Sequence, residues 1–430
     1  MDKLQLKKRL IELMKNDWSF PDDMNGDAFA DELKDALTST DSTLRDRLAY
    51  IAFYKLVSGG KVSDEKCRTL YFELIGDKYL QLGLGLEHDD SVFGRAFLVY
   101  AAEEFISYNR AVDRRLFTDE EVCNFLDIVL KVFIRERDLR GWDVEKGWAH
   151  AVAHTGDVLG GIALDPAIGR DGLMAILNAI RDKVCIDHFR WTAGEEGRLA
   201  YAVQSVLSRE EISESEFAQW IASFAEIKAD DPIRTRCLRL NRNEFFWHMY
   251  RTLKDSSPAL HKYVWDACES AVKQFIGIAE TGGFGNRDRG LIHCIADTGN
   301  VLGNLAKTAD HAGLLSILDM VRSRVYMDYC ADTNMNEIYY LPDDVVLKVL
   351  ERGLVSEEEF VEWIKSFQKC EHANDPATEA RMRLTRSEFA GTLAWRLSEK
   401  YPKLRKHVLD VRTALWEMEC DMTTEELTNN

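Results

Sequence analysis

The sequence has few prolines and no long apolar run. Its 430 residues include only 7 prolines, and because proline interrupts helices and central strands, so low a number favours a helical protein. Residues 1–15 are basic, but Leu4, Leu6, Leu10 and Leu13 alternate with charged residues, which predicts an amphipathic helix. We find neither a signal peptide nor a membrane span, so we expect no membrane contact.

Cysteine pairs with the spacing of a disulfide framework or a metal site are also missing. The nine cysteines are an odd number, lie far apart and include no Cys-x-x-Cys pair, which argues against both a disulfide framework and a cysteine zinc site. Reduced thiols suit a cytoplasmic protein, and we expect most of them to be small buried residues.

Basic residues are fewer than acidic residues. Lys and Arg number 55 against 73 Asp and Glu, so the net charge is −18. An acidic surface repels phosphate backbones, and no local run of basic residues compensates, so nucleic acid is not an expected partner. A protein or peptide is the partner that we expect.

An internal repeat is the strongest pattern in the chain. Four blocks recur in the same order at offsets of 141 to 144 residues, which indicates a duplication. The matching blocks are GWAHAVAHTGDVLGGIA (147–163) with GLIHCIADTGNVLGNLA (290–306), 173–184 with 314–325, SESEFAQWIASF (213–224) with SEEEFVEWIKSF (356–367), and RLNRNEF (239–245) with RLTRSEF (383–389).

Local patterns predict helices throughout both copies. Apolar residues within 173–184 and 217–224 recur with helical spacing. Hydroxyl residues followed three positions later by glutamate predict capping boxes, namely Thr118 with Glu121, Ser213 with Glu216, Ser356 with Glu359 and Thr385 with Glu388. No strand-like alternation of useful length appears, and Gly83 and Gly85 are typical of a turn.

These patterns predict an all-α protein. A helical-repeat array, a solenoid of the HEAT or armadillo type, suits them best, because each amphipathic pair must bury its face on the next; a closed α/α toroid is the alternative. The predicted organisation is an N-terminal helical cap (1–90), a first repeat unit (91–275), a second, diverged unit (276–420) and a polar tail (421–430).

The candidate site lies in GWAHAVAHTGDVLG, residues 147–160. His150, His154 and Asp157 share one narrow face of the predicted helix. They can be zinc ligands, with Asp157 as the third ligand or as support for an imidazole. They can instead be a structural junction in which the histidines bond to Asp157 and nearby backbone, or a metal-free site in which a histidine moves protons.

Two neighbouring segments offer further candidate ligands. Residues 138–148 and 194–200 supply Arg140, Trp142, Trp148, Glu195, Glu196 and Arg198. Either Glu195 or Glu196 is the expected additional metal ligand, whereas the tryptophans are more typical of packing than of ligand stacking. The small residues Ala149, Ala153, Gly156 and Gly160 form a strip that another helix can approach closely. In the second copy the site residues become His293, Asp297 and Asn300, which are weaker ligands.

The motif D-L-R-G-W-x-x-x-K-G-W-A-H-A-V-A-H, followed by E-E-G-R-L-A, resembles the bacterial family called domain of unknown function 2785. The likeness covers roughly residues 90–225, and the second copy keeps only part of the motif. The matching positions are Arg140, Gly141, Trp142, Lys146, Gly147, Trp148, His150, His154, Asp157, Glu196 and Arg198. The resemblance implies a bacterial, helical, soluble protein and supplies no chemistry.

Two functions remain open on the sequence alone. A helical array can present a surface to a protein or peptide partner without any catalytic residue, and this interaction role is the one that we expect. The alternative is a hydrolase-like enzyme that uses a metal or a histidine near His150, His154 and Asp157. No nucleophile elbow, P-loop or His-Glu-x-x-His motif supports a named reaction.

Overall fold

The computed structural model describes residues 3–112, 115–143, 145–191, 193–268, 302–303, 305–325, 341–369, 376–397 and 400–428. The chain divides into two compact units, Met1–Cys268 and Glu269–Asn430. Within the part of the chain so described, no helix has both the length and the apolar character that a membrane crossing needs. The boundaries that the sequence predicts at 90, 275 and 420 stay predictions.

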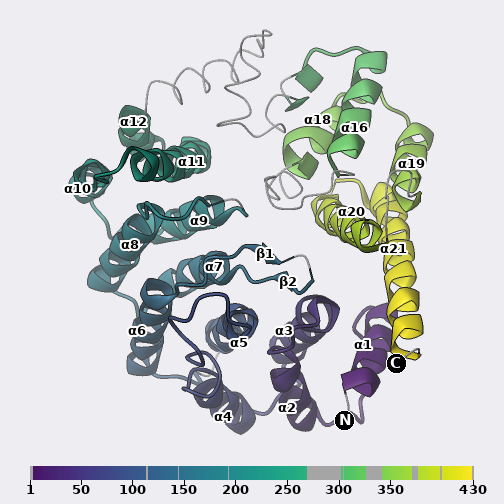
Figure 1. The fold of residues 1–430 in the computed structure, drawn as a ribbon, viewed down its shortest axis with the longest axis horizontal. Coiled ribbons are helices and arrows are strands. Elements are labelled where there is room, and N and C mark those ends of the chain that lie inside the picture. Colours follow the sequence, from purple (N-terminus) through teal and green to yellow (C-terminus); the bar gives the residue numbers. More distant parts are fainter. Residues whose placement is uncertain are drawn as a thin grey trace. The chain divides into compact units, whose positions relative to one another are not determined.

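The first unit consists of helices and one very small sheet (Figure 1). Its elements are α1 (Lys3–Lys15), α2 (Gly26–Ala36), the π-helical turn η1 (Thr43–Ala49), α3 (Tyr50–Ser58), α4 (Asp64–Leu74), α5 (Ser91–Ala111), α6 (Asp119–Arg135), β1 (Trp142–Asp143), β2 (Gly147–Trp148), α7 (Ala151–Ala163), α8 (Arg170–Val184), α9 (Glu195–Leu207), α10 (Glu214–Ser223), the 3-10 turn η2 (Phe224–Glu226), α11 (Pro232–Ser256) and α12 (Pro258–Ala267). The mostly helical class is therefore confirmed.

The small sheet corrects the expectation that strands are absent. Strands β1 and β2 are antiparallel, with Trp142 opposite Trp148 and Asp143 opposite Gly147. Two residues per strand are too few for any alternation to be visible in the sequence. The sheet nevertheless matters, because it lies inside the R-G-W-x-x-x-K-G-W part of the motif.

Helices of the first unit form two layers. In one layer α3, α5, α7, α9 and α11 are successive neighbours in contact. A second row, α4, α6, α8 and α10, runs along the other side of these helices (Figure 1), with α4 against α5, α6 against α7 and α8 against α9. Both α5 and α6 contribute fully buried phenylalanines to the core, among them Phe93, Phe105, Phe125 and Phe133. The layering supports the predicted repeat array, which remains a prediction.

The described part of the second unit is also helical. Its elements are α16 (His311–Val325), the π-helical turn η3 (Pro342–Val346), α18 (Leu347–Glu351), α19 (Glu357–Lys365), the 3-10 turn η4 (Ser366–Gln368), α20 (Pro376–Arg396) and α21 (Pro402–Thr428). The second-copy residues His293, Asp297 and Asn300 lie outside the described residues.

Three of the four predicted capping boxes form. Thr118, Ser213 and Ser356 each accept the backbone N–H three residues on, and the glutamate there bonds back to the cap. The prediction at Thr385 is wrong, because α20 already begins at Pro376 and Thr385 lies inside it. Proline favours the first turn of a helix, and this signal defines the start of α20.

Matching contacts occur in the two units. The indole N–H of Trp220 donates to the carbonyl of Leu177 at 2.9 Å, and that of Trp363 donates to the carbonyl of Leu318 at 2.8 Å. Stacked rings also correspond, Phe224 with Phe245 at 5.7 Å and Phe367 with Phe389 at 5.4 Å. These pairs occupy aligned positions of the predicted repeat and support a common origin of the two stretches.

Five cysteines within the described residues form no disulfide. Cys67, Cys185 and Cys268 are buried, as expected of small core residues, whereas Cys123 is exposed and Cys237 is half-buried.

Candidate functional site

The helix that contains the motif begins after His150. A shared helical face for His150, His154 and Asp157 would require His150 to lie inside the helix. Helix α7 starts at Ala151, and His150 is its N-cap with φ 41° and ψ 27°, the left-handed region. The N–H of His150 donates to the carbonyls of Arg140 and Gly141 at 3.0 and 3.2 Å. The predicted common helical face is therefore wrong for His150, because a left-handed residue does not continue the helical progression.

His150 is held inside the junction by its ring. Its Nε2–H donates to the carbonyl of Ala193 at 2.8 Å, and its ring stacks on Trp148 at 4.6 Å. A carbonyl oxygen only accepts, so Nε2 carries the proton and Nδ1 carries the lone pair. Burial lowers the pKa of His150 well below its usual range, with the charge of Arg198 acting in the same direction.

His154 makes the same kind of contact with the neighbouring helix. Its Nδ1–H donates to the carbonyl of Ala96 on α5 at 3.0 Å, and its ring packs against Phe97 and Tyr100 at 4.9 and 4.4 Å. Burial, together with the charge of Arg198, lowers the pKa of His154 to about 3. The imidazole is therefore neutral at physiological pH, with its lone pair on Nε2.

Asp157 bonds to other residues than the histidines. It accepts a hydrogen bond from the hydroxyl of Tyr100 and one from the guanidinium of Arg198, the latter at 3.0 Å. The side chains of Asp157 and Arg198 are 20% and 38% exposed. The structural alternative is therefore right about the backbone partners of the histidines and wrong about Asp157 as their acceptor.

The two glutamates at the start of α9 are buried beside the histidines. Glu195 accepts the N–H of Ala193 at 3.0 Å, and its Oε1 lies 3.5 Å from Nε2 of His150. Glu196 forms an ion pair with Arg190 at 2.5 Å. Burial, followed by the charge of Glu196, raises the pKa of Glu195 to about 8, so this carboxyl is mostly protonated at neutral pH.

The remaining motif residues hold the small sheet in place. Arg140 makes a bidentate pair with Asp138 at 2.8 and 2.7 Å and donates to the carbonyl of Asp89 at 3.2 Å. The rings of Trp142 and Trp148 meet edge to face at 4.8 Å. Trp148 is buried and Trp142 half-buried, so Trp148 packs as expected and Trp142 keeps part of its ring at the surface.

The small strip of α7 contacts α9 closely, as predicted. A Cβ added at Gly156 would lie 2.7 Å from Cδ2 of Leu199, and one at Gly160 would lie 3.1 Å from Cα of Ala202. A side chain at Gly156 would require the side chain of Leu199 to move, and one at Gly160 would require the backbone of α9 to shift by a few tenths of an ångström. The contact places Arg198 of α9 next to Asp157 of α7.

The structure thus brings the nine predicted residues into one cluster but does not arrange a metal centre. Among the described residues, no group of three or more histidine, cysteine, aspartate or glutamate side chains is placed to hold a metal ion. His150 and His154 each donate one ring N–H to a backbone carbonyl, and Asp157 bonds to Tyr100 and Arg198. Zinc needs about four ligands, and the proposed set does not supply them here.

The cluster lies in the part of the chain that is similar to a known protein family. Residues 80–250 match the family model described as "Protein of unknown function (DUF2785)". The match spans 171 of the 430 residues, so this segment of the chain is similar to the DUF2785 family. No curated protein matches the sequence. A crystal structure of an engineered protein from the Northeast Structural Genomics Consortium is similar at 13% identity over 96% of this chain and 89% of that chain, with a TM-score of 0.26.

The DUF2785 segment contains all nine predicted site residues and also partners that sequence reasoning missed. Tyr100 on α5 and Arg190 before α9 complete the network, as do the backbone carbonyls of Ala96 and Ala193. Tyr100 lies in an apolar stretch that gives no polar signal, and backbone acceptors carry no sequence signal. Only Arg190, a charge between two motif segments, could have been suspected.

A continuous row of rings results. It runs from Trp142 and Trp148 through His150 and His154 to Tyr100 and Tyr50, with neighbouring ring centres 4.4 to 5.4 Å apart. The middle of the row is buried, while Trp142 at one end and Tyr100 near the other are half-buried. The motif therefore forms a buried interior whose edges reach the surface.

Proposed function

We propose that this chain is a binding protein for a protein or peptide partner, and that the partner contacts the edge of the motif cluster. We call the exposed ends of the cluster the motif surface and define it by Trp142 at one end of the ring row and by Tyr100, Asp157 and Arg198 at the other. The observation that carries the proposal is the Tyr100–Asp157–Arg198 network, which stays partly exposed while the histidines beneath it are buried.

The motif surface has the composition of an interface centre. Tyrosine, tryptophan and arginine are the side chains that most often dominate protein binding energies. Asp157 holds both Tyr100 and Arg198 in fixed positions. Because their rotamers are already restricted, little side-chain entropy is lost on binding.

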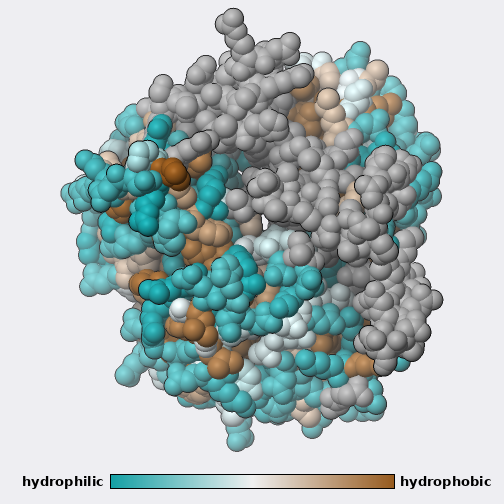
Figure 2. All heavy atoms as spheres, viewed as in Figure 1, coloured by the Kyte–Doolittle hydropathy of each residue, from teal (hydrophilic) through white to brown (hydrophobic). Residues whose placement is uncertain are grey.

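The wider surface favours a partner recognised by polar contacts. Figure 2 shows the visible face of the described residues as mostly hydrophilic, with hydrophobic residues in small separate groups. The net charge of −18 disfavours a strongly acidic partner, because like charges across an interface are repulsive. A neutral or basic peptide that offers hydrogen bonds to Asp157 and Arg198 fits these conditions.

One observation favours the hydrolase-like alternative, and burial weighs against it. The protonated carboxyl of Glu195 lies 3.5 Å from His150, and perturbed carboxyl groups often mark active sites. Glu195 is only 1% exposed and His150 4%, so neither side chain is open to a substrate. The pair instead supports the shape of the motif surface.

Peptide selection on the full chain tests the proposal. Peptides from a random display library are selected on the wild type, and their dissociation constants are measured for Arg198→Ala, Trp142→Ala and the control Arg181→Ala, which changes an arginine on α8. We expect a loss of about tenfold or more in the first two variants and no loss in the control.

Circular dichroism confirms that each variant is folded before its affinity is interpreted. Peptides that bind both motif-surface variants as tightly as the wild type contradict the proposal. Selection that yields no saturable binder also contradicts it.

A further inference from the structure

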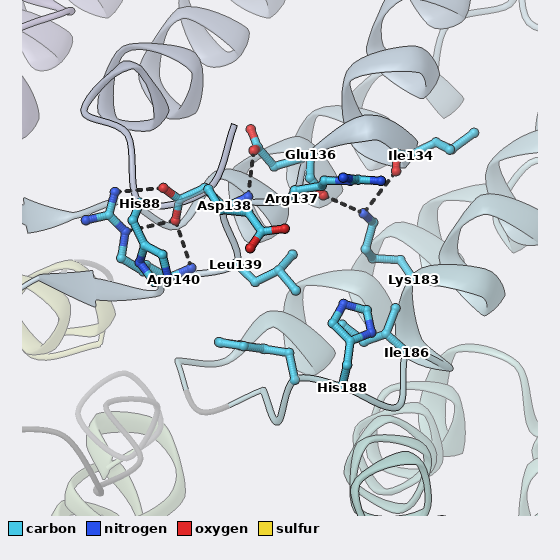
Figure 3. A pocket seen from close by; sticks show the side chains of 12 residues that line it. His88, Ile134, Glu136, Arg137, Asp138, Leu139, Arg140, Lys183, Ile186 and His188 are labelled. Atoms are coloured by element: carbon cyan, nitrogen blue, oxygen red, sulfur yellow. Dashed lines mark hydrogen bonds and ion pairs between the residues drawn. The ribbon is translucent and has the colours of Figure 1, made fainter. Parts of the chain in front are cut away.

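A second feature of the first unit is lined by none of the four residues of the motif surface, although Arg140 of the motif borders it. It is a pocket of about 460 Å³ bordered by the segment that follows α6 and the segment that follows α8. In Figure 3, Glu136 to Arg140 lie on one side, Ile186 and His188 on the other, and Lys183 between them. A volume of this size is in the range of small-molecule sites.

The acidic side chains of the pocket wall are mostly neutralised by arginines. The carboxylate of Glu136 accepts hydrogen bonds from Nε and Nη2 of Arg95 at 2.6 and 2.9 Å. The carboxylate of Asp138 accepts two hydrogen bonds from the guanidinium of Arg140 at 2.8 and 2.7 Å. Glu87 is the third carboxylate that lines the pocket, and it is exposed.

The cations of the wall are less fully paired. Lys183, which is almost completely buried, donates to the carbonyls of Glu136 and Ile134 at 3.2 and 3.4 Å. An ammonium group has three N–H donors, and besides the two carbonyls the ring of Phe133 lies 5.4 Å from this Nζ. The guanidinium of Arg137 is exposed, and the structure gives it no hydrogen bond or ion pair with any described residue. His88 and His188 add two further nitrogen-bearing rings.

The rest of the wall is apolar. Ile134, Leu139, Ile186 and Phe189 line the pocket together with the cations. A ligand that fits both parts carries an anionic group at one end and an apolar body at the other. Three carboxylates and three cations line the pocket, and Arg95, which pairs with Glu136 without lining the pocket, supplies a fourth positive charge.

We propose that this pocket binds a small organic anion, a carboxylate or a phosphate attached to an apolar body, through Arg137 and Lys183. The guanidinium of Arg137 bonds the anionic oxygens in its planar fork, and the Nζ of Lys183 supplies a second positive charge. The apolar body contacts Ile186 and Phe189. The site is separate from the motif surface, so it can be tested without reference to a peptide partner.

Calorimetric titration of the full chain with three probes tests this site. Benzoate and phenyl phosphate carry the two candidate anions on the same ring, and benzamide is the neutral control. We expect saturable binding of one anion per chain for at least one of the first two, and the tighter of these identifies the anionic group. We expect no binding of benzamide.

Two matched variants localise the binding. Arg137→Gln removes an exposed cation of the pocket and should weaken the anion at least about fivefold. Arg135→Gln removes the same charge two residues away, on a side chain that does not line this pocket, and should change the affinity less than about twofold. Equal losses in the two variants, equal binding of benzamide, or no saturable binding of either anion would each overturn the proposal.

Discussion

The carbonyl of Ala96 on α5 accepts the Nδ1–H of His154 on α7 at 3.0 Å. This bond joins two neighbouring helices and at the same time fixes the tautomer of the imidazole, because a carbonyl cannot donate. His150 bonds to Ala193 in the same way. The most conspicuous residues of the motif thus act as neutral cross-links between backbone segments.

Neutral buried histidines make stability depend on pH. Burial lowers the pKa values of His150, His154 and His248 in the folded chain, whereas the unfolded chain takes up these protons below about pH 6.5. The unfolded state then binds more protons than the folded state, so the free energy of unfolding falls as pH decreases from about 6.5 towards the folded pKa of His154 and His248, about 3. Each histidine contributes up to about 1.4 kcal/mol per pH unit.

Denaturant unfolding at several pH values measures this slope. His154→Gln should reduce it by the contribution of one histidine, whatever the variant does to stability at pH 7. His188→Gln is the control, because that side chain is 60% exposed, and its slope should match the wild type. Identical slopes in His154→Gln and the wild type would show that His154 takes up no proton on unfolding.

Gly156→Leu should destabilise the chain by about 2 kcal/mol or more. The added side chain would collide with Leu199 on α9, since even a Cβ would lie 2.7 Å from that residue, and overpacking of such contacts is costly. Gly169→Ser is the control, because a Cβ at Gly169 meets no atom within 4 Å and serine suits this N-cap position. Thermal unfolding measures both; equal stability of Gly156→Leu and the wild type argues against a tight α7–α9 contact. Gly299, the counterpart predicted from the sequence, lies outside the described residues.

The predicted duplication can be tested through its matched tryptophans. Trp220→Phe and Trp363→Phe each remove an indole N–H from a buried carbonyl, so each should cost about 1 to 3 kcal/mol of unfolding free energy. The two losses should agree within about 1 kcal/mol. Trp395→Phe, at a side chain 64% exposed, should change little. A large loss of unfolding free energy in Trp220→Phe with none in Trp363→Phe would argue against equivalent contacts in the two copies.

Sequence reasoning succeeded where local patterns dictate structure. The helix over 173–184, the capping boxes at Thr118 and Ser213, and the close approach along Gly156 and Gly160 follow from periodicity, side-chain hydrogen bonding and size. Each depends on residues near one another in the chain or on a single helix face.

It failed where partners are distant or belong to the backbone. The left-handed conformation of His150 depends on Arg140 and Gly141, which hold its N–H from the preceding loop. The acceptors of both histidines are carbonyls 43 and 58 residues away. The choice of Tyr100 and Arg198 as partners of Asp157 depends on how three helices pack, which no local pattern specifies.

In the structure the motif forms a neutral, hydrogen-bonded junction. Nitrogen-15 NMR of the full chain, labelled at histidine and purified without a metal-affinity tag, tests it at pH 7, with His150→Gln and His154→Gln used to assign the signals. We expect His154 to be protonated at Nδ1 and His150 at Nε2, with neither signal changed by one equivalent of zinc. A charged imidazolium at either position, or zinc-dependent shifts at both, would contradict this claim.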